Sequence, residues 1–260
     1  MSNAAQSFNR LLSILEDLRE QCPWDRAQTF DSLRPNTIEE TYELSESLLA
    51  KDMSGMKEEL GDLLLHIAFY AKMASEESAF NIADVCDAVS DKLVRRHPHI
   101  YGDTNANSEK AVRQNWEQIK QQEKTDKGTF DGIPASLSSL IKASRLQEKA
   151  SGVGFDWNNN GQVWDKVKEE IQEFQQEVEK AKSQNNGDAL NEEFGDLLFS
   201  LVNYARFIGI DPDNALEKTN QKFTRRFNRM EQQVRDAGRA MKDMELSELE
   251  GLWQAAKADG

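Results

Sequence analysis

The sequence predicts an all-α protein made of two tandem helical modules. Its 260 residues suit about two domains at roughly 150 residues each. Charged residues make up 30% of the chain and hydrophobic residues 38%, a composition that favours amphipathic helices with solvated outer faces. Acidic and basic motifs also occur twice in the same order, as in a duplicated unit. We expect four-helix-bundle-like modules over residues 1–125 and 126–260.

Apolar spacing and chain breaks predict the helices of the first module. Leucines recur at helical spacing over residues 8–19, before a Cys-Pro pair ends the pattern. Thr37 is expected to cap a second helix that runs toward Ala50. A third helix over residues 56–75 should pack antiparallel to it. A fourth over 82–96 should end before Pro98.

Three short motifs return in the same order in the second module. Glu-Glu-x-x-Glu stands at 39–43 and 169–173, Glu-x-Gly-Asp at 59–62 and 193–196, and Arg-Arg at 95–96 and 225–226. The distance between copies grows by four residues across 182–189. We interpret that stretch as a longer hairpin loop, where insertions are tolerated.

The acidic motifs predict a metal site in each module. Residues three and four apart share a helix face, and an antiparallel hairpin brings the second motif opposite the first. Such a cluster needs solvent, protons or a cation, and its oxygen ligands suit Mg²⁺, with Mn²⁺ also possible. Solvated acidic helix faces are the ordinary interpretation of one copy, but repetition favours a site. The candidate ligands are Glu169, Glu170, Glu173, Glu193 and Asp196, and Glu39, Glu40, Glu43, Glu59 and Asp62.

A glycine lies between the acids of each second motif, at Gly61 and Gly195. Because glycine weakens a helix by about 1 kcal/mol relative to alanine, these positions should gain something from the missing side chain. We expect close helix approach or ligand access there.

Basic pairs suggest where phosphates bind. Lys222 and Arg226 are four residues apart and share a helix face, and Lys92 and Arg96 match them in the first module. Lys166 precedes Glu169 by three residues, and either contacts phosphate or pairs with that glutamate. Asn36 stands at the equivalent place in the first module. The second module is therefore the better equipped one, and catalysis in the first is open.

These motifs resemble those of the MazG family of nucleoside triphosphate pyrophosphohydrolases, within the all-α superfamily that includes dimeric dUTPases. Cys22-Pro23-Trp24-Asp25, the segment 95–99 and the segment 153–157 are also similar to segments of that family. The resemblance extends over nearly the whole chain. It implies magnesium-dependent hydrolysis of NTPs and dNTPs to monophosphate and pyrophosphate by a homodimer.

The resemblance also implies roles for individual residues. Glu192 would be a further ligand or a base, and Trp253 would lie near the nucleotide, although Trp253 suits a core anchor equally well. The five acids of the second module would hold the metal, and Lys166, Lys222 and Arg226 the phosphates. Glu170 and Glu192 are the candidates for taking the proton of the attacking water.

Two other functions remain open at this stage. A non-catalytic helical module that binds nucleotide or metal as a regulator or scaffold would show the same motifs. A phosphohydrolase of another type could use His97 and His99 as metal ligands, but these residues follow a helix end and have no histidine counterpart, so we expect structural roles. His66 is expected to be a packing residue. The preferred base and the physiological substrate are not predicted.

Charge and cysteine content indicate the setting. A net charge of −14 repels phosphate polymers, which argues against nucleic acid as a partner. Only Cys22 and Cys86 are present, without metal-ligand spacing. No secretory segment opens the chain and no apolar stretch would span a membrane. We therefore expect a cytoplasmic protein.

Overall fold

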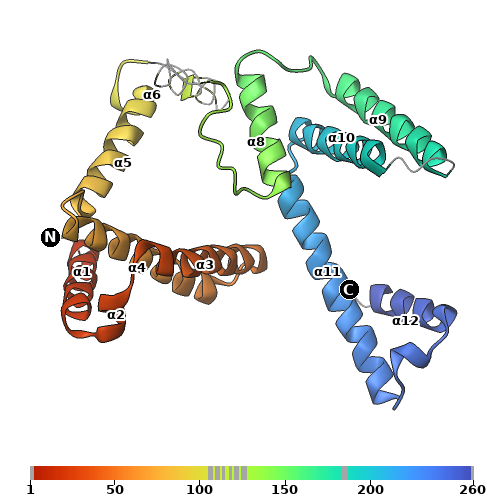
Figure 1. Ribbon diagram of the computed structural model, residues 1–260, viewed down its shortest axis with the longest axis horizontal. Coiled ribbons are helices and arrows are strands. Elements are labelled where there is room, and N and C mark those ends of the chain that lie inside the picture. Colours follow the sequence, from red (N-terminus) through yellow and green to blue (C-terminus); the bar gives the residue numbers. More distant parts are fainter. Residues whose placement is uncertain are drawn as a thin grey trace. The chain divides into compact units, whose positions relative to one another are not determined.

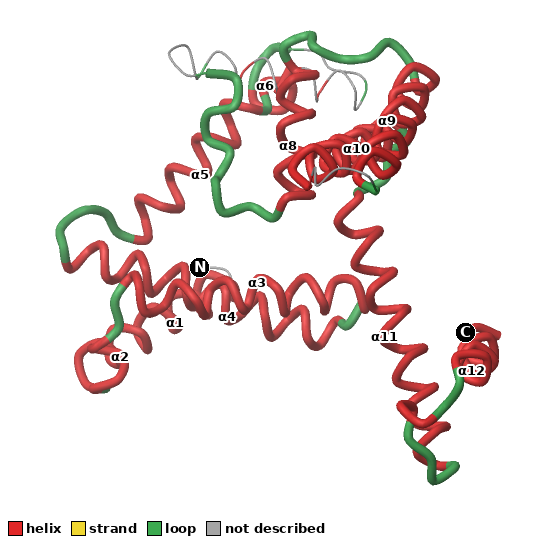
Figure 2. Tube along the Cα trace, turned by 45° about the vertical axis from the view of Figure 1, so that its right-hand side comes forward, coloured by secondary structure: helices red, strands yellow, loops and turns green. Residues whose placement is uncertain are grey.

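The computed structural model of the chain divides into two compact units, residues 1–124 and 125–260. It describes residues 3–104, 108, 112, 115, 116, 119, 123, 128–182 and 187–258. All regular secondary structure in these described residues is helical (Figures 1 and 2), which confirms the predicted all-α class with tandem helical modules. Within the described part, no helix combines the length and apolar character needed to cross a bilayer.

The first unit is built on an antiparallel helical hairpin. Helix α3 lies along α4, and α1 packs against the C-terminal half of α4 (Figure 1). Leu15 of α1 and Leu33 of α3 meet Phe69 and Met73 of α4 in the buried core. The helices are α1 (Asn3–Gln21), α2 (Pro23–Ala27), α3 (Phe30–Ala50), α4 (Met53–Glu76), α5 (Ile82–Arg96) and α6 (Pro98–Tyr101).

The predicted start of the second long helix is wrong. Helix α3 begins at Phe30, because Thr29 and Ser32 form a capping box in which each side chain accepts a hydrogen bond from the other residue's backbone N–H. Pro35 therefore lies inside the helix, in its second turn. Thr37 caps nothing, and its hydroxyl bonds Leu33 O at 3.1 Å and Tyr70 Oη at 2.7 Å.

Arg19 fixes the corner between α1, α2 and α4. Its guanidinium donates to the backbone carbonyls of Asp25 and Gln28 at 2.5 and 3.2 Å, and pairs with Glu76 at 2.6 Å. The Phe69 ring lies 5.5 Å below the same guanidinium. One buried cation thus satisfies a tight turn and covers part of the core.

The second unit repeats the hairpin and adds a long helix. Helices α9 and α10 form the antiparallel pair, and α8 packs against α10. Val163 and Val167 of α9 and Val202 of α10 are buried, and the Trp164 ring packs at a tilt against that of Tyr204, with ring centroids 4.8 Å apart. The elements are α8 (Ser139–Gly152), α9 (Asn160–Ala181), α10 (Gly187–Phe207), α11 (Pro212–Asp236), η1 (Met241–Asp243) and α12 (Leu246–Ala258).

One sequence prediction falls partly outside the described residues. Of the predicted 182–189 loop, residues 183–186 are not described, whereas residues 187–189 already belong to α10. The other helix predictions agree with the structure at their cores. The fourth helix ends at Arg96 before Pro98, as expected, and a four-residue helix follows.

Candidate active site

The α9–α10 hairpin brings three of the predicted acids together. Oxygens of Glu170, Glu173 and Glu193 lie within 4.8 Å of one another. Burial raises the pKa of Glu193, and the negative charges of Glu173, Asp196 and Glu170 add to the effect. Glu170 is 6% exposed, so the cluster has one carboxylate in the protein interior. Charge of this density, partly withdrawn from water, favours a bound cation.

The α3–α4 hairpin of the first unit forms a matching cluster. Oxygens of Glu40, Glu43 and Glu59 lie within 4.8 Å of one another. Burial raises the pKa of Glu40, with Asp62 and Glu43 contributing, and burial likewise raises the pKa of Glu59. Both copies of the repeated motif therefore converge in space. Two sets of three acids converge in the same way, on hairpins of the same kind.

The remaining predicted ligands lie around these clusters rather than in them. Asp196 lines the same cavity as Glu170 and raises the pKa of Glu193, and Asp62 acts on Glu40 in the same way. Glu169 pairs with Lys166 instead of joining the three acids. Glu39 and Glu192 are exposed on α3 and α10.

Lys166 lies one turn before the second-unit acids. Its Nζ is 2.7 Å from carboxylate oxygens of both Glu169 and Glu170. Hydrogen bonding to Glu169 and Glu170 raises the pKa of Lys166, which keeps the side chain cationic. Asn36, the equivalent residue in the first unit, supplies no such charge. The second cluster alone therefore has a cation built into its edge.

The two helix glycines are not explained by packing within the chain. A Cβ added at Gly61 or Gly195 would meet nothing within 4 Å among the described residues. The expected close helix approach is thus absent inside one chain. Open space beside the acids is compatible with the other expectation, access for a ligand.

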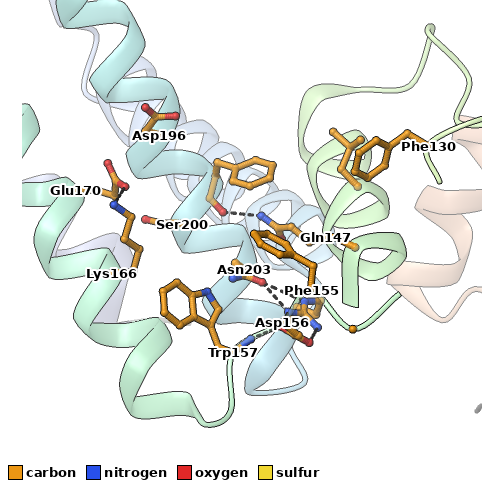
Figure 3. Close-up of a pocket in the computed structure, with 15 residues that line it drawn as sticks. Phe130, Gln147, Phe155, Asp156, Trp157, Lys166, Glu170, Asp196, Ser200 and Asn203 are labelled. Carbon is orange, nitrogen blue, oxygen red and sulfur yellow. Dashed lines mark hydrogen bonds and ion pairs between the residues drawn. The ribbon is translucent and has the colours of Figure 1, made fainter. Parts of the chain in front are cut away.

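A cavity of about 510 Å³ adjoins the second cluster and lies between α8, α9 and α10. Figure 3 shows Lys166 and Glu170 of α9 facing Asp196 of α10, with Phe155 and Trp157 farther along the same space. Its walls are mainly apolar, and the charged residues Lys166, Glu170 and Asp196 line the part next to the acidic cluster. That combination suits a small ligand with one planar apolar part and one anionic part.

Two of the predicted phosphate-binding residues of the second unit, Lys222 and Arg226, lie on α11 rather than on the hairpin that carries Lys166. Figures 1 and 2 both show α11 leading away from the α9–α10 hairpin. Lys222 is exposed on α11, and Arg226 is half-buried with an Nε that lacks a hydrogen-bond partner. Trp253 of α12 packs on Phe223 of α11, at 5.0 Å between ring centroids. No interaction seen between described residues joins Lys222, Arg226 or Trp253 to the acids of the same chain.

In the first unit the predicted phosphate ligand Arg96 already has an anionic partner. Arg96 and Arg95 both hold the carboxylate of Glu123, at 2.6 and 2.7 Å. The Trp116 ring lies 5.8 Å from the Arg96 guanidinium. Lys92 is exposed on the same helix. Glu123 thus occupies the position that a phosphate would take on Arg96.

The ion pair at Glu123 predicts a pH-dependent loss of stability. Hydrogen bonds from Arg96 and Arg95 lower the pKa of Glu123 from 4.5 to about 2. The pair therefore stabilises the fold fully above pH 4.5, the ordinary value, and loses that contribution as the pH falls through about 2. We expect Glu123→Gln to lower the free energy of urea unfolding at neutral pH, and the difference to shrink in acid.

The exposed Glu46 of α3 provides the control for this experiment. Glu46→Gln should leave the unfolding free energy almost unchanged across the same pH series. A Glu123→Gln deficit that stays constant from neutral pH into acid would contradict an ionic origin.

The histidines lie outside the candidate metal clusters. Among the described residues, the groups of three or more close potential ligands contain glutamates only. His97 Nδ1 lies 2.6 Å from Leu93 O, and its ring is 5.6 Å from that of His99. His66 is 8% exposed on the packed face of α4, and burial lowers its pKa. Each position agrees with the expected structural role.

Sequence reasoning missed the polar residues of the cavity. Arg206 binds both oxygens of Asp156 at 2.9 and 2.5 Å and donates to Asn203 Oδ1. Gln147 is a polar residue, yet it is buried on the apolar face of α8. A polar residue at an apolar helical position was the available signal.

Comparison with known proteins gives one family. The model of the "MazG nucleotide pyrophosphohydrolase domain" matches residues 28–101 and 160–230, one segment in each unit. A nucleoside triphosphate pyrophosphohydrolase of Escherichia coli K12 is 44% identical over 256 residues, covering 96% of this chain and 97% of that protein. The Thermotoga maritima protein named nucleoside triphosphate pyrophosphohydrolase/pyrophosphatase MazG is 43% identical over 261 residues, covering 99% and 98%.

A more distant relative matches only in part. The nucleoside triphosphate pyrophosphohydrolase of Mycobacterium tuberculosis is 34% identical over 145 residues, or 55% of this chain and 44% of that protein. The two matched segments contain the α3–α4 and α9–α10 hairpins, and hence both acidic clusters. With two domain matches and full-length similarity above 40%, this chain belongs to the MazG family.

Proposed function

We propose that this chain is a magnesium-dependent nucleoside triphosphate pyrophosphohydrolase, which converts NTPs and dNTPs to monophosphates and pyrophosphate. The observation that supports it best is the contact between an acidic cluster and an apolar cavity in the second unit. Glu170 belongs to both, and Lys166 and Asp196 line the cavity beside it. The names of the full-length relatives describe the same activity.

The chemistry of the carboxylates fits Mg²⁺. Three carboxylates within 4.8 Å supply hard oxygen ligands and leave positions for water and phosphate oxygens. Burial and the neighbouring acids raise the pKa of Glu193 and of Glu59, which supports a cation as the partner of each cluster. Bound Mg²⁺ supplies Lewis-acid polarisation of phosphate oxygens and of a water. Mn²⁺ has similar ligand preferences and is the second candidate.

The chain's own residues then divide the remaining work. We assign Glu170 to accept the proton of the water whose oxygen bonds to the α-phosphorus, as the bond to the bridging oxygen breaks. The electron pair of that broken bond leaves with the pyrophosphate. Lys166, held between Glu169 and Glu170, keeps a positive charge on the wall of the cavity. Glu192 remains the alternative base and lies exposed on α10.

The second unit is the catalytic one in this proposal. Only its cluster has a lysine at its edge, because the first unit has Asn36 at that position. Arg96 of the first unit is paired with Glu123. The first cluster is proposed to bind metal, with a smaller part in catalysis or none.

We further propose a homodimer. Large apolar side chains remain uncovered on α10 and α11, including Phe194 at 48% exposed, Leu198 at 42% and Phe223 at 54%. Lys222 and Arg226 have no acidic cluster beside them in their own chain. A second copy that covers these faces and brings its α11 to the acids accounts for both observations.

The free cysteines and the net charge support a cellular location and a class of ligand. Both cysteines are free, as in a reducing compartment, so we propose a cytoplasmic location. The net charge of −14 supports a small, metal-bound phosphate ligand over a nucleic-acid polymer.

Product analysis tests the proposal. We expect equal amounts of monophosphate and pyrophosphate from several NTPs, and loss of both products when a chelator removes divalent cations. Oxygen from labelled water should appear in the monophosphate if attack is at the α-phosphorus. Release of orthophosphate, or no release with intact Glu170 and Asp196, would refute the proposed activity.

A further inference from the structure

Most polar side chains that line the cavity of the second unit already have hydrogen-bond partners within the protein. Arg206, Asp156 and Asn203 satisfy one another through the hydrogen bonds described above. The Ser200 hydroxyl donates to Leu197 O at 2.9 Å. These groups shape the cavity between the apolar walls of Phe155 and Trp157, but their hydrogen-bonding capacity is largely used within the protein.

Gln147 is the exception. Its side chain is 6% exposed, and its Nε2 donates to Phe199 O at 2.8 Å (Figure 3). A backbone carbonyl can only accept, so the amide nitrogen must face Phe199 and the oxygen must point elsewhere. That oxygen, Oε1, is buried without a hydrogen-bond partner. A buried acceptor of this kind is costly unless something donates to it.

The first unit has a different residue at the position equivalent to Gln147. Glu16 stands at the position equivalent to Gln147, and it pairs with Lys72. Phe69 replaces Asn203 and is buried, and Arg19 replaces Ala150 and lies over the Phe69 ring. The buried amide of Gln147 therefore has no counterpart in the first unit, where a charged side chain with an ion-pair partner stands at that position.

We infer that Gln147 Oε1 accepts a hydrogen bond from an N–H group on the base of the substrate. The inference rests on the proposed function, which places the phosphates at the acids and hence the nucleoside in the adjoining cavity. Phe155 and Trp157 supply apolar contact for a planar ring. Gln147 makes the site specific for bases that present an N–H donor.

This role does not choose among the standard bases. Adenine and cytosine present an amino group, and guanine, uracil and thymine present a ring N–H. Gln147 thus distinguishes a base with a donor from one without, and remains compatible with several NTPs. The discriminating pair is ATP and purine riboside triphosphate, which share ring, sugar and phosphates but differ in the amino group.

The test measures kcat/KM for pyrophosphate release from both nucleotides. For the unchanged chain we expect ATP to be preferred by about tenfold or more, since the analogue leaves the buried acceptor unpaired. Gln147→Leu should lower the ATP value and bring the ratio close to one. Because each ratio is measured within one variant, a reduced fraction of folded protein cancels.

Ser200→Ala is the matched control in the same cavity, and its ratio should stay that of the unchanged chain. Equal kcat/KM for both nucleotides in the unchanged chain would overturn the inference without needing a variant. An equal loss for both nucleotides in Gln147→Leu would also overturn it, since the oxygen would then serve the sugar or the packing. Absence of pyrophosphate from every NTP would instead refute the proposed function.

Discussion

Glu170→Gln is expected to lower kcat for pyrophosphate release by about 10³-fold or more. The substitution keeps the size of the side chain but removes a metal ligand and the assigned proton acceptor together. Glu170 is 6% exposed and 2.7 Å from Lys166 Nζ, so burial and an ion pair hold its carboxylate in place. A steady-state assay of pyrophosphate gives kcat directly.

Two further glutamate-to-glutamine variants serve as controls for this result. Glu179→Gln alters an exposed glutamate on the same helix, which pairs with Lys182 away from the cluster, and should keep nearly full activity. Glu40→Gln makes the same change in the first-unit cluster and should cost far less than Glu170→Gln. If the Glu40 variant loses as much as the Glu170 variant, the assignment of catalysis to the second unit is wrong.

The acidic clusters were predictable because helix geometry is regular. Residues three and four apart share a face in any helix, and a hairpin with a short connection must place neighbouring faces together. The repeat supplied the second observation that one acidic pattern lacks. The structure brings Glu170, Glu173 and Glu193 to one point, as this argument requires.

Helix starts were less predictable, because competing caps differ little in energy. Thr37 and Thr29 are both acceptable N-cap residues, and Pro35 between them argues for the later one. The earlier start is set by Ser32, which completes a capping box with Thr29. A reciprocal pair outweighs one proline in the second turn, and the choice depends on side-chain geometry.

Tertiary contacts at long range could not be predicted at all from spacing. Glu123 lies 27 residues after Arg96, and nothing in the sequence assigns it to that arginine. The Gln147 bond to Phe199 crosses 52 residues. Periodicity reports which face of a helix a residue occupies. It does not report which other helix covers that face.

Mixing two inactive variants should restore activity if the site is shared between copies. Arg226→Ala is expected to lower kcat/KM by about 100-fold, since a guanidinium that binds phosphate is lost. Arg226 belongs to α11, a helix that leads away from the α9–α10 hairpin, and its Nε has no hydrogen-bond partner among the described residues. In a mixed dimer, the intact Glu170 of the Arg226→Ala copy would meet the intact Arg226 of the Glu170→Gln copy.

The number of complete sites in a mixed dimer determines how much activity returns. Equal amounts of the two variants, allowed to exchange subunits, should form mixed dimers in about half of the population, each with one working site of two, so about a quarter of the full activity returns. Mixing Glu170→Gln with Glu193→Gln is the control, because both changes fall in one cluster and no mixed dimer regains a complete site. Arg226→Ala with full activity, or a mixture as inactive as its components, would place the phosphate-binding residues of each site within one chain.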